Sequence, residues 1–333
     1  MRKSILLLLL AIVAVSLSQA RGLRVPPFLK PGDKVAIISP AGPAPQSIID
    51  NGVKALTRWG YEPVVGPSAD KRWHKYGGTI KQRRADLTWA LQDTSIKAIL
   101  CTRGGYGCAQ VLNGMSVDLF RRNPKWIIGY SDVTALHSTS VSAGNMSIHS
   151  VMCDPIDRTD TVTRALQYLL AGKMPVYQVP NHRYNVKGTA RGILLGGNLS
   201  VLTDLAESPY DMLRREVIHN QDVILFIEDT QESIHHVDRM LHQFMLRGII
   251  GHIKGLIVGI FNHYGPDYGY TNMYDMMNEY FKDLPIPVCY NFPVGHDNSR
   301  NFPLVEGCPA TLTVGDDSTT LVMSLPWRQG LDL

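Results

Sequence analysis

The sequence predicts an α/β protein in which an N-terminal doubly wound parallel sheet is followed by a C-terminal mixed α/β domain. From residue 34, short β-branched runs alternate with amphipathic stretches, which is the pattern of βα units. These runs are continuously apolar, as is typical of strands that helices cover on both faces. The 333-residue length exceeds the size at which a single core usually stops growing, so we expect two domains.

The elements of the first half follow from periodicity and from turn residues. We expect strands at 34–39, 62–65, 96–101 and 125–129, and helices at 46–59 and 80–91. In the first helix the apolar residues recur at helical spacing and stop before Gly60, a residue that favours helix ends.

A second series of elements follows a polar segment that proline and glycine interrupt. We place the linker at 179–190, between an N-terminal domain at 21–178 and a C-terminal domain at 191–333. The second domain is expected to contain strands at 192–195, 223–227, 256–260 and 288–290, and helices at 235–246 and 273–281. Alternating apolar and polar residues at 310–325 predict antiparallel strands.

Residues 1–20 have the pattern of a secretory signal peptide. Arg2 and Lys3 precede an unbroken apolar stretch at 5–15, and small residues lead to Ala20. The apolar stretch is shorter than the roughly 20 residues that span a bilayer, so we expect cleavage after Ala20 and no stable membrane insertion. The expected location is the periplasm or the cell envelope.

Composition excludes several classes of protein. With 19% charged and 44% hydrophobic residues, the chain is globular, not disordered or fibrous. The net charge of +4 comes without a dense basic run, so nothing favours nucleic-acid binding. Five cysteines are too few and too scattered for a disulfide scaffold, and no zinc-ligand spacing occurs. We therefore expect no metal and no cofactor.

Ligands of open α/β sheets bind beyond the carboxyl ends of the strands, so the residues that follow each strand are the candidates for chemistry. Ser131 follows the strand at 125–129 and precedes a helix. This strand–turn–helix arrangement resembles the nucleophile elbow of hydrolases, although Val133 stands where that motif has its second glycine. Ser131 could instead simply cap the helix.

The strand at 96–101 leads into Arg103, Gly104 and Gly105. Glycines in such a turn allow left-handed backbone and can present N–H groups to an anion, while an arginine can hold a carboxylate through two hydrogen bonds. The pattern matches no phosphate-binding loop. The alternative is an ordinary tight turn. A thiol nucleophile at Cys101 or Cys108 is disfavoured because no neighbouring group would lower its pKa.

Two further candidates follow strands of the second domain. Glu228 ends the strand at 223–227, where a buried carboxylate needs a partner and could orient a histidine. Otherwise it is an exposed loop acid or lies near a helix N-terminus. His296 follows Gly295 and the strand at 288–290, and could act as a general base. Arg300, in the same loop, is a second candidate for binding a substrate carboxylate.

Several motifs, in order along the chain, together resemble one family. They are V-A-I-I-S-P-A near the start, R-G-G-Y-G at 103–107, G-Y-S-D at 129–132, L-G-G-N-L at 195–199, I-E-D at 227–229 and V-G-H at 294–296. This set is similar to that of the LD-carboxypeptidases, serine peptidases that include the murein tetrapeptide carboxypeptidases and the microcin C immunity peptidases. After the histidine the chain departs from the family's usual L-P-L-G.

The resemblance implies a Ser131–His296–Glu228 triad, with an oxyanion hole made by backbone N–H groups of Asp132 and of Gly104 and Gly105. It also makes Asn198 a substrate-binding candidate. It implies a flavodoxin-like N-terminal domain, an active site in the cleft between the domains, and a homodimer. The implied reaction releases the C-terminal D-Ala of murein tetrapeptides. Family members are mainly cytoplasmic, which makes the signal sequence a departure.

Two other readings of the sequence stay open. A non-enzymatic exported binding protein would also have two α/β domains around a cleft, and Arg103 would suit it. Alternatively, the same peptidase chemistry could act on microcin C-like peptidyl nucleotides or on other acyl-amino acids.

Overall fold

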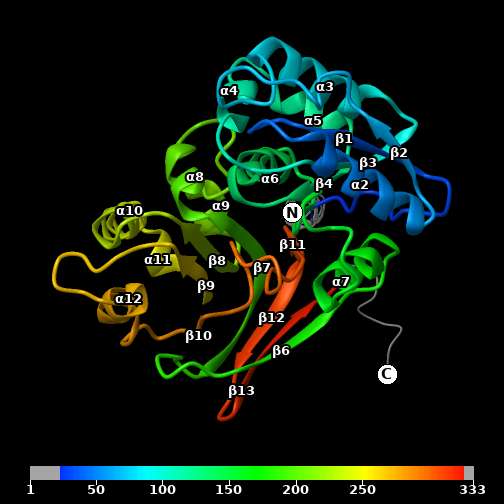
Figure 1. The fold of residues 1–333 in the computed structure, drawn as a ribbon. Helices are drawn as coiled ribbons and strands as arrows, with labels where there is room; N and C mark the ends of the chain where they lie inside the picture. Colours follow the sequence, from blue (N-terminus) through cyan, green and yellow to red (C-terminus); the bar gives the residue numbers. More distant parts are fainter. Residues whose placement is uncertain (1–22, 326–333) are drawn as a thin grey trace, which may run out of the picture.

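The computed structural model describes residues 23–325, so the expected signal peptide at 1–20 lies outside the described residues. The described chain is built on two β-sheets, one of six and one of seven strands. Figure 1 shows the two sheets as separate layers, with helices packed around each.

The first sheet has the flavodoxin-like strand order that the sequence implied. Its parallel strands are β1 (Lys34–Ile38), β2 (Glu62–Val65), β3 (Ile96–Cys101), β4 (Trp126–Gly129) and β5 (Ser147–His149), in the spatial order β2-β1-β3-β4-β5. The order reverses between β1 and β3, and such a switch point is where ligands of doubly wound sheets bind. The loops after β1, β3 and β4 therefore face the predicted site.

Helices on both sides of this sheet bury its apolar faces. They are α2 (Gln46–Arg58), α3 (Ile80–Gln92), α4 (Cys108–Leu112), α5 (Val117–Arg122), α6 (Thr134–Ser142) and α7 (Thr161–Leu170), with a 3₁₀ turn, η1 (Ser131–Val133), before α6. Thr79 and Gln82 form a capping box that fixes the start of α3. Residues 134–141 of α6 are all buried.

The second sheet is mixed. It contains β6 (Val176–Pro180), β7 (Gly188–Asn198), β8 (Val223–Thr230), β9 (Gly255–Asn262), β10 (Val288–Tyr290), β12 (Pro309–Val314) and β13 (Ser318–Met323), in the order β10-β9-β8-β7-β12-β13-β6. Strands β7 to β10 run parallel, whereas β12, β13 and β6 pair antiparallel. The helices of this half are α8 (Leu199–Asp204), α9 (Arg215–Asn220), α10 (Ile234–Leu246), α11 (Ile249–His252) and α12 (Met273–Phe281).

The two sheets do not divide at the expected linker. Strand β6 begins at Val176 but belongs to the second sheet, because it pairs with β13. Strand β11 (Leu304–Glu306) comes from the C-terminal part of the chain but pairs antiparallel with β5 in the first sheet. The expected linker at 179–190 also overlaps the end of β6 and the start of β7. Periodicity indicates that a strand forms, but not which strand it pairs with.

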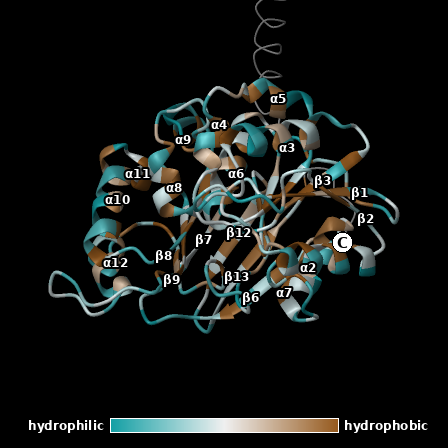
Figure 2. Ribbon diagram, turned by 45° about the horizontal axis from the view of Figure 1, so that its top comes forward, coloured by the Kyte–Doolittle hydropathy of each residue, from teal (hydrophilic) through white to brown (hydrophobic). Residues whose placement is uncertain are grey.

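The hydrophobic residues are concentrated in the strands and on the inward faces of the helices, as the brown central strands in Figure 2 show. Strand β4 is wholly buried, and the first seven residues of β8 are buried as well. Ser131 comes two residues after β4, whereas Glu228 lies within β8, which continues to Thr230 instead of ending at the expected residue 227. Both candidates therefore extend from the rigid interior of their sheets.

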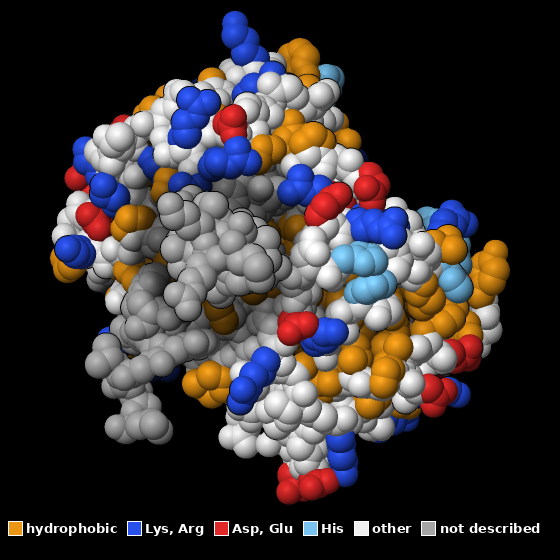
Figure 3. All heavy atoms as spheres, turned by 180° about the vertical axis from the view of Figure 1, so that it is seen from behind, with side chains coloured by type: hydrophobic (Ala, Val, Ile, Leu, Met, Phe, Trp, Pro, Cys, Tyr) orange, Lys and Arg blue, Asp and Glu red, His pale blue; other side chains and the backbone are white. Residues whose placement is uncertain are grey.

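All five cysteines are buried free thiols. On the face opposite that in Figure 1, Lys and Arg side chains are interspersed with Asp and Glu among the described residues, without a wide patch of one sign (Figure 3). No helix among residues 23–325 combines the length and the apolar character needed to cross a bilayer.

Candidate active site

Ser131 lies at a sharp turn between β4 and α6. Its backbone has φ of +63°, a left-handed conformation that non-glycine residues adopt rarely and at a cost. This turn raises the serine above the end of the sheet, as in a nucleophile elbow. The prediction that Ser131 lies between a strand and a helix is confirmed, with one 3₁₀ turn inserted before α6.

The side chains of Ser131, His296 and Glu228 form one hydrogen-bonded chain. The Nδ1 atom of His296 lies 2.7 Å from Oε2 of Glu228, and its Nε2 atom lies 2.9 Å from Oγ of Ser131. When Nδ1–H donates to the carboxylate, Nε2 is left to accept the serine proton. This geometry allows the imidazole to remove a proton from the hydroxyl.

Burial and charge together determine the pKa of His296 in this hydrogen-bonded series. The side chain of Glu228 is fully buried and that of His296 is 16% exposed. Burial acts against the charged imidazolium, but the Glu228 carboxylate outweighs it and raises the pKa of His296 above its usual value. The carboxylate therefore makes the histidine a stronger base than a free imidazole.

The backbone before His296 must pass very close to Glu228. Gly295 has φ of +127°, and a Cβ atom there would lie 3.0 Å from both Cβ and Oε2 of Glu228. Only glycine fits such a conformation without displacing the carboxylate. The V-G-H motif thus has a steric explanation: its glycine lets the histidine loop reach the acid.

The glycine turn after β3 packs directly against the serine. A Cβ atom at Gly104 would lie 2.9 Å from Oγ of Ser131 and 3.6 Å from the backbone nitrogen of Asp132. The carbonyl of Gly104 accepts a hydrogen bond of 3.1 Å from the N–H of Gly42, in the loop after β1. The turn thus brings the backbone of Gly104 beside both Oγ of Ser131 and the backbone nitrogen of Asp132.

The carboxylate of Asp132 holds the start of α4 in place. It is buried and accepts a hydrogen bond of 2.8 Å from the N–H of Cys108, at the start of α4. The buried Arg83 holds the other side of the same loop, because its Nη1 donates to the carbonyls of Pro40 and Gly107, each at 2.8 Å. Neither Arg83 nor this use of Asp132 was predicted from the sequence, because both depend on loops that are distant along the chain.

A cavity of about 670 Å³ opens in front of the serine, and residues of both sheets line it. Arg103, Gly104, Gly105, Ser131, Asp132, Asn198 and His296 all take part in this lining. Arg103 is exposed and forms no ion pair with the described residues. Its guanidinium is therefore free to bind a ligand at the edge of the cavity.

The other two substrate-binding candidates are placed differently. Asn198 reaches the cavity, but its Nδ2 donates to Oδ1 of Asp229 at 2.9 Å and its Oδ1 caps α8. Arg300 lines a separate hollow of about 380 Å³, together with Tyr290 and Phe302. The structure thus brings Arg103 to the serine and leaves Arg300 outside the cavity.

The cavity also contains residues that were not predicted. The ring of Tyr130 packs edge-on against His296, with 4.9 Å between ring centroids, and its hydroxyl donates to Asn298 at 3.1 Å. Asp204 and Glu232 line the cavity as well. A signal for Glu232 existed in the sequence, since this acid comes two residues after the end of β8.

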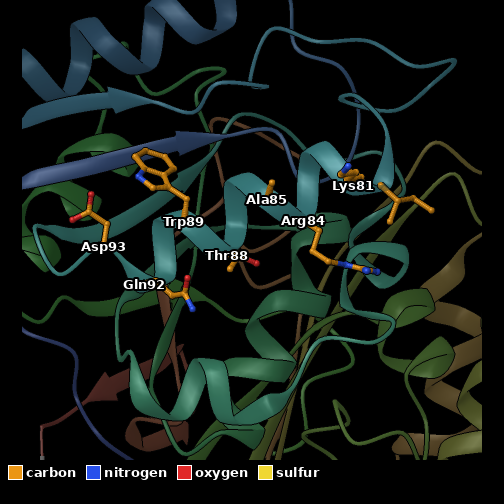
Figure 4. A pocket seen from close by; sticks show the side chains of 8 residues that line it. Lys81, Arg84, Ala85, Thr88, Trp89, Gln92 and Asp93 are labelled. Atoms are coloured by element: carbon orange, nitrogen blue, oxygen red, sulfur yellow. The ribbon is translucent and has the colours of Figure 1, made fainter.

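A larger hollow lies elsewhere and has no comparable chemistry. It measures about 980 Å³ and runs along the outer face of α3, where Figure 4 shows Lys81, Arg84, Thr88, Trp89 and Gln92. Its described lining comes from α3 and from Asp93, the residue that follows the helix. It includes none of Ser131, His296 and Glu228. Within residues 23–325 no group of three or more His, Cys, Asp or Glu side chains could hold a metal ion.

Sequence comparison agrees with this architecture. The LD-carboxypeptidase N-terminal domain matches residues 35–150, and the LD-carboxypeptidase C-terminal domain matches residues 191–312. The chain belongs to the LD-carboxypeptidase family. It is therefore a peptide hydrolase of the carboxypeptidase type.

Individual relatives and solved structures support the assignment. The chain is 32% identical over 272 residues to the "Putative carboxypeptidase slr1534" of Synechocystis, covering 80% of this chain and 87% of that protein. It is 30% identical over 287 residues to the "Probable murein peptide carboxypeptidase" of Bacillus subtilis, covering 81% and 86%. The crystal structure of muramoyltetrapeptide carboxypeptidase from Oxalobacter formigenes superposes with a TM-score of 0.77 at 26% identity, covering 88% of this chain and 99% of that one.

Proposed function

We propose that this LD-carboxypeptidase is a serine enzyme that hydrolyses the bond between L-Lys or meso-diaminopimelate and the C-terminal D-Ala of murein tetrapeptides. The observation that carries the proposal is the hydrogen-bonded chain from Glu228 through His296 to Ser131. Relatives named as murein peptide carboxypeptidases support the choice of substrate.

In the proposed acylation step, Nε2 of His296 removes the proton of Ser131 as Oγ attacks the carbonyl carbon of the residue before D-Ala. The carbonyl oxygen becomes an oxyanion, which the N–H groups of Asp132 and of the Gly104–Gly105 turn stabilise. Glu228 keeps the imidazole in one tautomer and stabilises its charged form. His296 then gives the proton to the nitrogen of D-Ala, and the amino acid leaves.

In the second step a water molecule takes the place of the leaving amine. His296 removes a proton from this water, the hydroxide attacks the acyl-enzyme, and the collapse of the second oxyanion returns the proton to Oγ of Ser131. The tripeptide leaves with a new carboxylate. Every proton in this sequence moves through His296, whose access to the cavity allows both transfers.

A carboxypeptidase must recognise a free C-terminal carboxylate. Arg103 is the exposed cation that lines the cavity next to the glycine turn, and a guanidinium can bind a carboxylate through two parallel hydrogen bonds. We assign the terminal carboxylate of the substrate to Arg103, which would place the preceding peptide bond toward Ser131.

Two acidic residues of the cavity favour an amine-bearing substrate over a peptidyl nucleotide. Asp204 and Glu232 both line the cavity. Burial and then the charge of Glu232 raise the pKa of Asp204, so the two carboxylates repel each other. A phosphate would add to this repulsion, whereas the side-chain ammonium of Lys or diaminopimelate would relieve it.

The deciding experiment supplies the purified protein with a disaccharide tetrapeptide and, in parallel, with a peptidyl acyl-adenylate analogue. We expect mass spectrometry to find loss of D-Ala from the tetrapeptide and at most slow cleavage of the analogue. Cleavage of the analogue alone would move the enzyme to the microcin C-like substrate class. If neither is cleaved and a serine-directed phosphonate fails to label Ser131, the proposed serine mechanism and both substrate classes are rejected.

We further propose that the enzyme works outside the cytoplasm, in the periplasm or the cell envelope, and as a homodimer. The charged, apolar and small-residue pattern of residues 1–20 supports export. Residue 21 should be the first residue of protein recovered from the envelope fraction, and a start at Met1 would reject cleavage. Light scattering should give the mass of two chains.

A further inference from the structure

The loop that carries His296 is hydrogen-bonded to strand β9 at two alternate residues. The N–H of Ile260 donates to the carbonyl of Val294 at 2.8 Å. Two residues further along both segments, Nδ2 of Asn262 donates to the carbonyl of His296, also at 2.8 Å. Asn262 is the last residue of β9, so its side-chain amide extends the attachment of the loop as far as the histidine itself.

The orientation of the Asn262 amide is fixed by its two partners. A carbonyl can only accept a hydrogen bond, so Nδ2 must face His296 and Oδ1 must face the other way. On that side the hydroxyl of Thr230 donates to Oδ1 at 2.6 Å. Thr230 is the last residue of β8 and is the partner of Asn262 in the ladder between β8 and β9. The threonine thus supplies the donor that keeps the amide aimed at the histidine.

Both strands leave this pair through strained backbone. Gln231 and His263, which directly follow Thr230 and Asn262, have φ of +65° and +58°, a left-handed conformation that non-glycine residues adopt rarely. The N–H of Gln231 donates to the carbonyl of Asn262 at 3.0 Å, and both strained residues line the cavity. Such strain persists only where the surrounding contacts hold it, and the side-chain bond between Thr230 and Asn262 is one of these contacts.

The same two strands also place Glu228. Their register shifts between Ile227 and Asp229, so that two residues of β9 lie opposite Glu228 before the pairing resumes. The histidine loop meets the acid at this bulge, because a Cβ atom at Gly295 would lie 3.0 Å from Oε2 of Glu228 and 3.1 Å from the carbonyl oxygen of Ile260. The ladder that resumes after the bulge fixes the distance along β8 from the acid to the threonine.

We propose that Thr230 and Asn262 are positioning residues of the active site: the threonine hydroxyl aims the amide at the carbonyl of His296 and so holds the imidazole within reach of the serine. The other side of the histidine is held separately, since Gly295 donates its N–H to Oδ1 of Asn301 at 3.0 Å. Both positioning residues act through the backbone, not on the reacting atoms. The proposal rests on the proposed serine mechanism, but on no particular substrate.

The test compares two single variants and their combination. Thr230→Val removes the hydroxyl at nearly constant volume, and Asn262→Ala removes the amide. Each should lower kcat by about tenfold or more with KM within about twofold, because a shift of the general base affects the chemical step. The double variant should be no slower than the slower single variant, since both substitutions disable the same hold on the histidine.

A conservative variant and matched controls separate positioning from a structural role. Thr230→Ser keeps the hydroxyl donor and should keep most of the wild-type kcat. Thr203→Val removes the hydroxyl of another half-buried threonine, one that bonds within α8, and Asn123→Ala removes a half-buried amide that donates to the carbonyl of Leu119. Both controls should lower the melting temperature without lowering kcat.

The rate of Ser131 labelling by a phosphonate gives the same comparison without a peptide substrate. Slower labelling in Thr230→Val and Asn262→Ala, with a rate near that of the wild type in Thr230→Ser, supports the proposal even if murein peptides are not hydrolysed. If Asn262→Ala fails to fold, the two variants of Thr230 still decide the question.

Three results would overturn the proposal alone. They are wild-type labelling and kcat in folded Thr230→Val, an equal loss in Thr230→Ser, and losses that multiply in the double variant. A wild-type protein that the phosphonate leaves unlabelled would overturn the serine mechanism and this proposal with it. A wild-type protein that labels rapidly but leaves tetrapeptide intact would contradict only the proposed substrate.

Discussion

The Nε2 atom of His296 lies 2.9 Å from the Oγ atom of Ser131, although 165 positions separate the two residues along the chain. Ser131 follows a strand of the first sheet, and His296 follows a strand of the second. The contact therefore exists only when both halves of the chain are folded and packed together. Under the proposed mechanism, activity is therefore a direct measure of that packing.

Replacing Ser131 separates its chemical role from its backbone strain. Ser131→Ala and Ser131→Gly should both lose turnover by several orders of magnitude, as expected when a nucleophile is removed. Glycine tolerates the positive φ, so Ser131→Gly should unfold with a free energy about 1 kcal/mol higher than Ser131→Ala. Tetrapeptide hydrolysis and urea unfolding measure the two effects.

The control for the serine variants is Ser299→Ala. Ser299 is exposed in the histidine loop, and its Oγ donates to Asp297 at 2.6 Å. The Ser299→Ala variant should keep the activity of the wild type. Near-full activity in Ser131→Ala would reject the nucleophile assignment.

Glu228→Gln should change the pH dependence of the reaction as well as its rate. The base form of His296 is the active one, so kcat/KM rises as pH passes the pKa of His296, which Glu228 raises. Without the Glu228 carboxylate, burial opposes the charged imidazolium and only the smaller effect of Asp229 favours it, so the rise in kcat/KM should move to lower pH. The maximal rate should fall about 100-fold or more, because the amide can hold the wrong tautomer.

The matched control is Glu62→Gln, which removes an exposed carboxylate paired with Lys34 on the first sheet. Its pH profile should coincide with that of the wild type. An unchanged profile in Glu228→Gln would show that Glu228 does not set the basicity of His296.

Much of the site could be predicted because its residues follow strand ends. Ser131, Glu228 and His296 each come directly after a predicted strand or a few residues beyond it, and the carboxyl ends of parallel strands are where ligands bind. Strands β2, β3 and β10 and helix α12 have the predicted bounds, because their apolar runs end at clear turn residues.

The remainder depends on contacts that no local pattern encodes. Nothing in the three residues of β11 indicates that they pair with β5 instead of with a neighbour in sequence. The hold of Asn301 on Gly295 requires a loop to fold back over six residues in a buried setting. The sequence makes both Arg103 and Arg300 candidates for binding a substrate carboxylate. Only the folded structure shows that they line different hollows.

That difference gives a prediction about substrate binding. Arg103→Ala should raise KM for the tetrapeptide by about tenfold or more, because a charge-assisted hydrogen bond to the terminal carboxylate is lost. The effect should disappear with a substrate whose C-terminus is amidated. Arg300→Ala is the matched control and should leave KM unchanged. Equal KM increases in the two variants would contradict the assignment of the carboxylate to Arg103.

The buried His137 predicts how stability depends on pH. Its Nδ1 and Nε2 contact Oγ of Ser147 and the carbonyl of Gly129 at 2.6 and 2.9 Å. Burial lowers its pKa from 6.5 to about 4, so between these pH values the unfolded chain binds a proton that the folded protein does not. This contribution to the free energy of unfolding is complete above pH 6.5 and is lost as pH falls toward 4, by about 3 kcal/mol.

The measurement is urea unfolding of the wild type and of His137→Gln at pH values from 7.5 to 4.5. The variant should be less stable at neutral pH, since its contacts are altered, but its stability should fall less steeply on acidification. His149 adds a loss of the same sign, so the slope should decrease without vanishing. The raised pKa of His296 gives a contribution that grows as pH falls to 6.5 and is constant below it, so the slopes of the two proteins are compared below pH 6.5. Parallel curves for the two proteins would show that His137 is protonated equally in the folded and unfolded states.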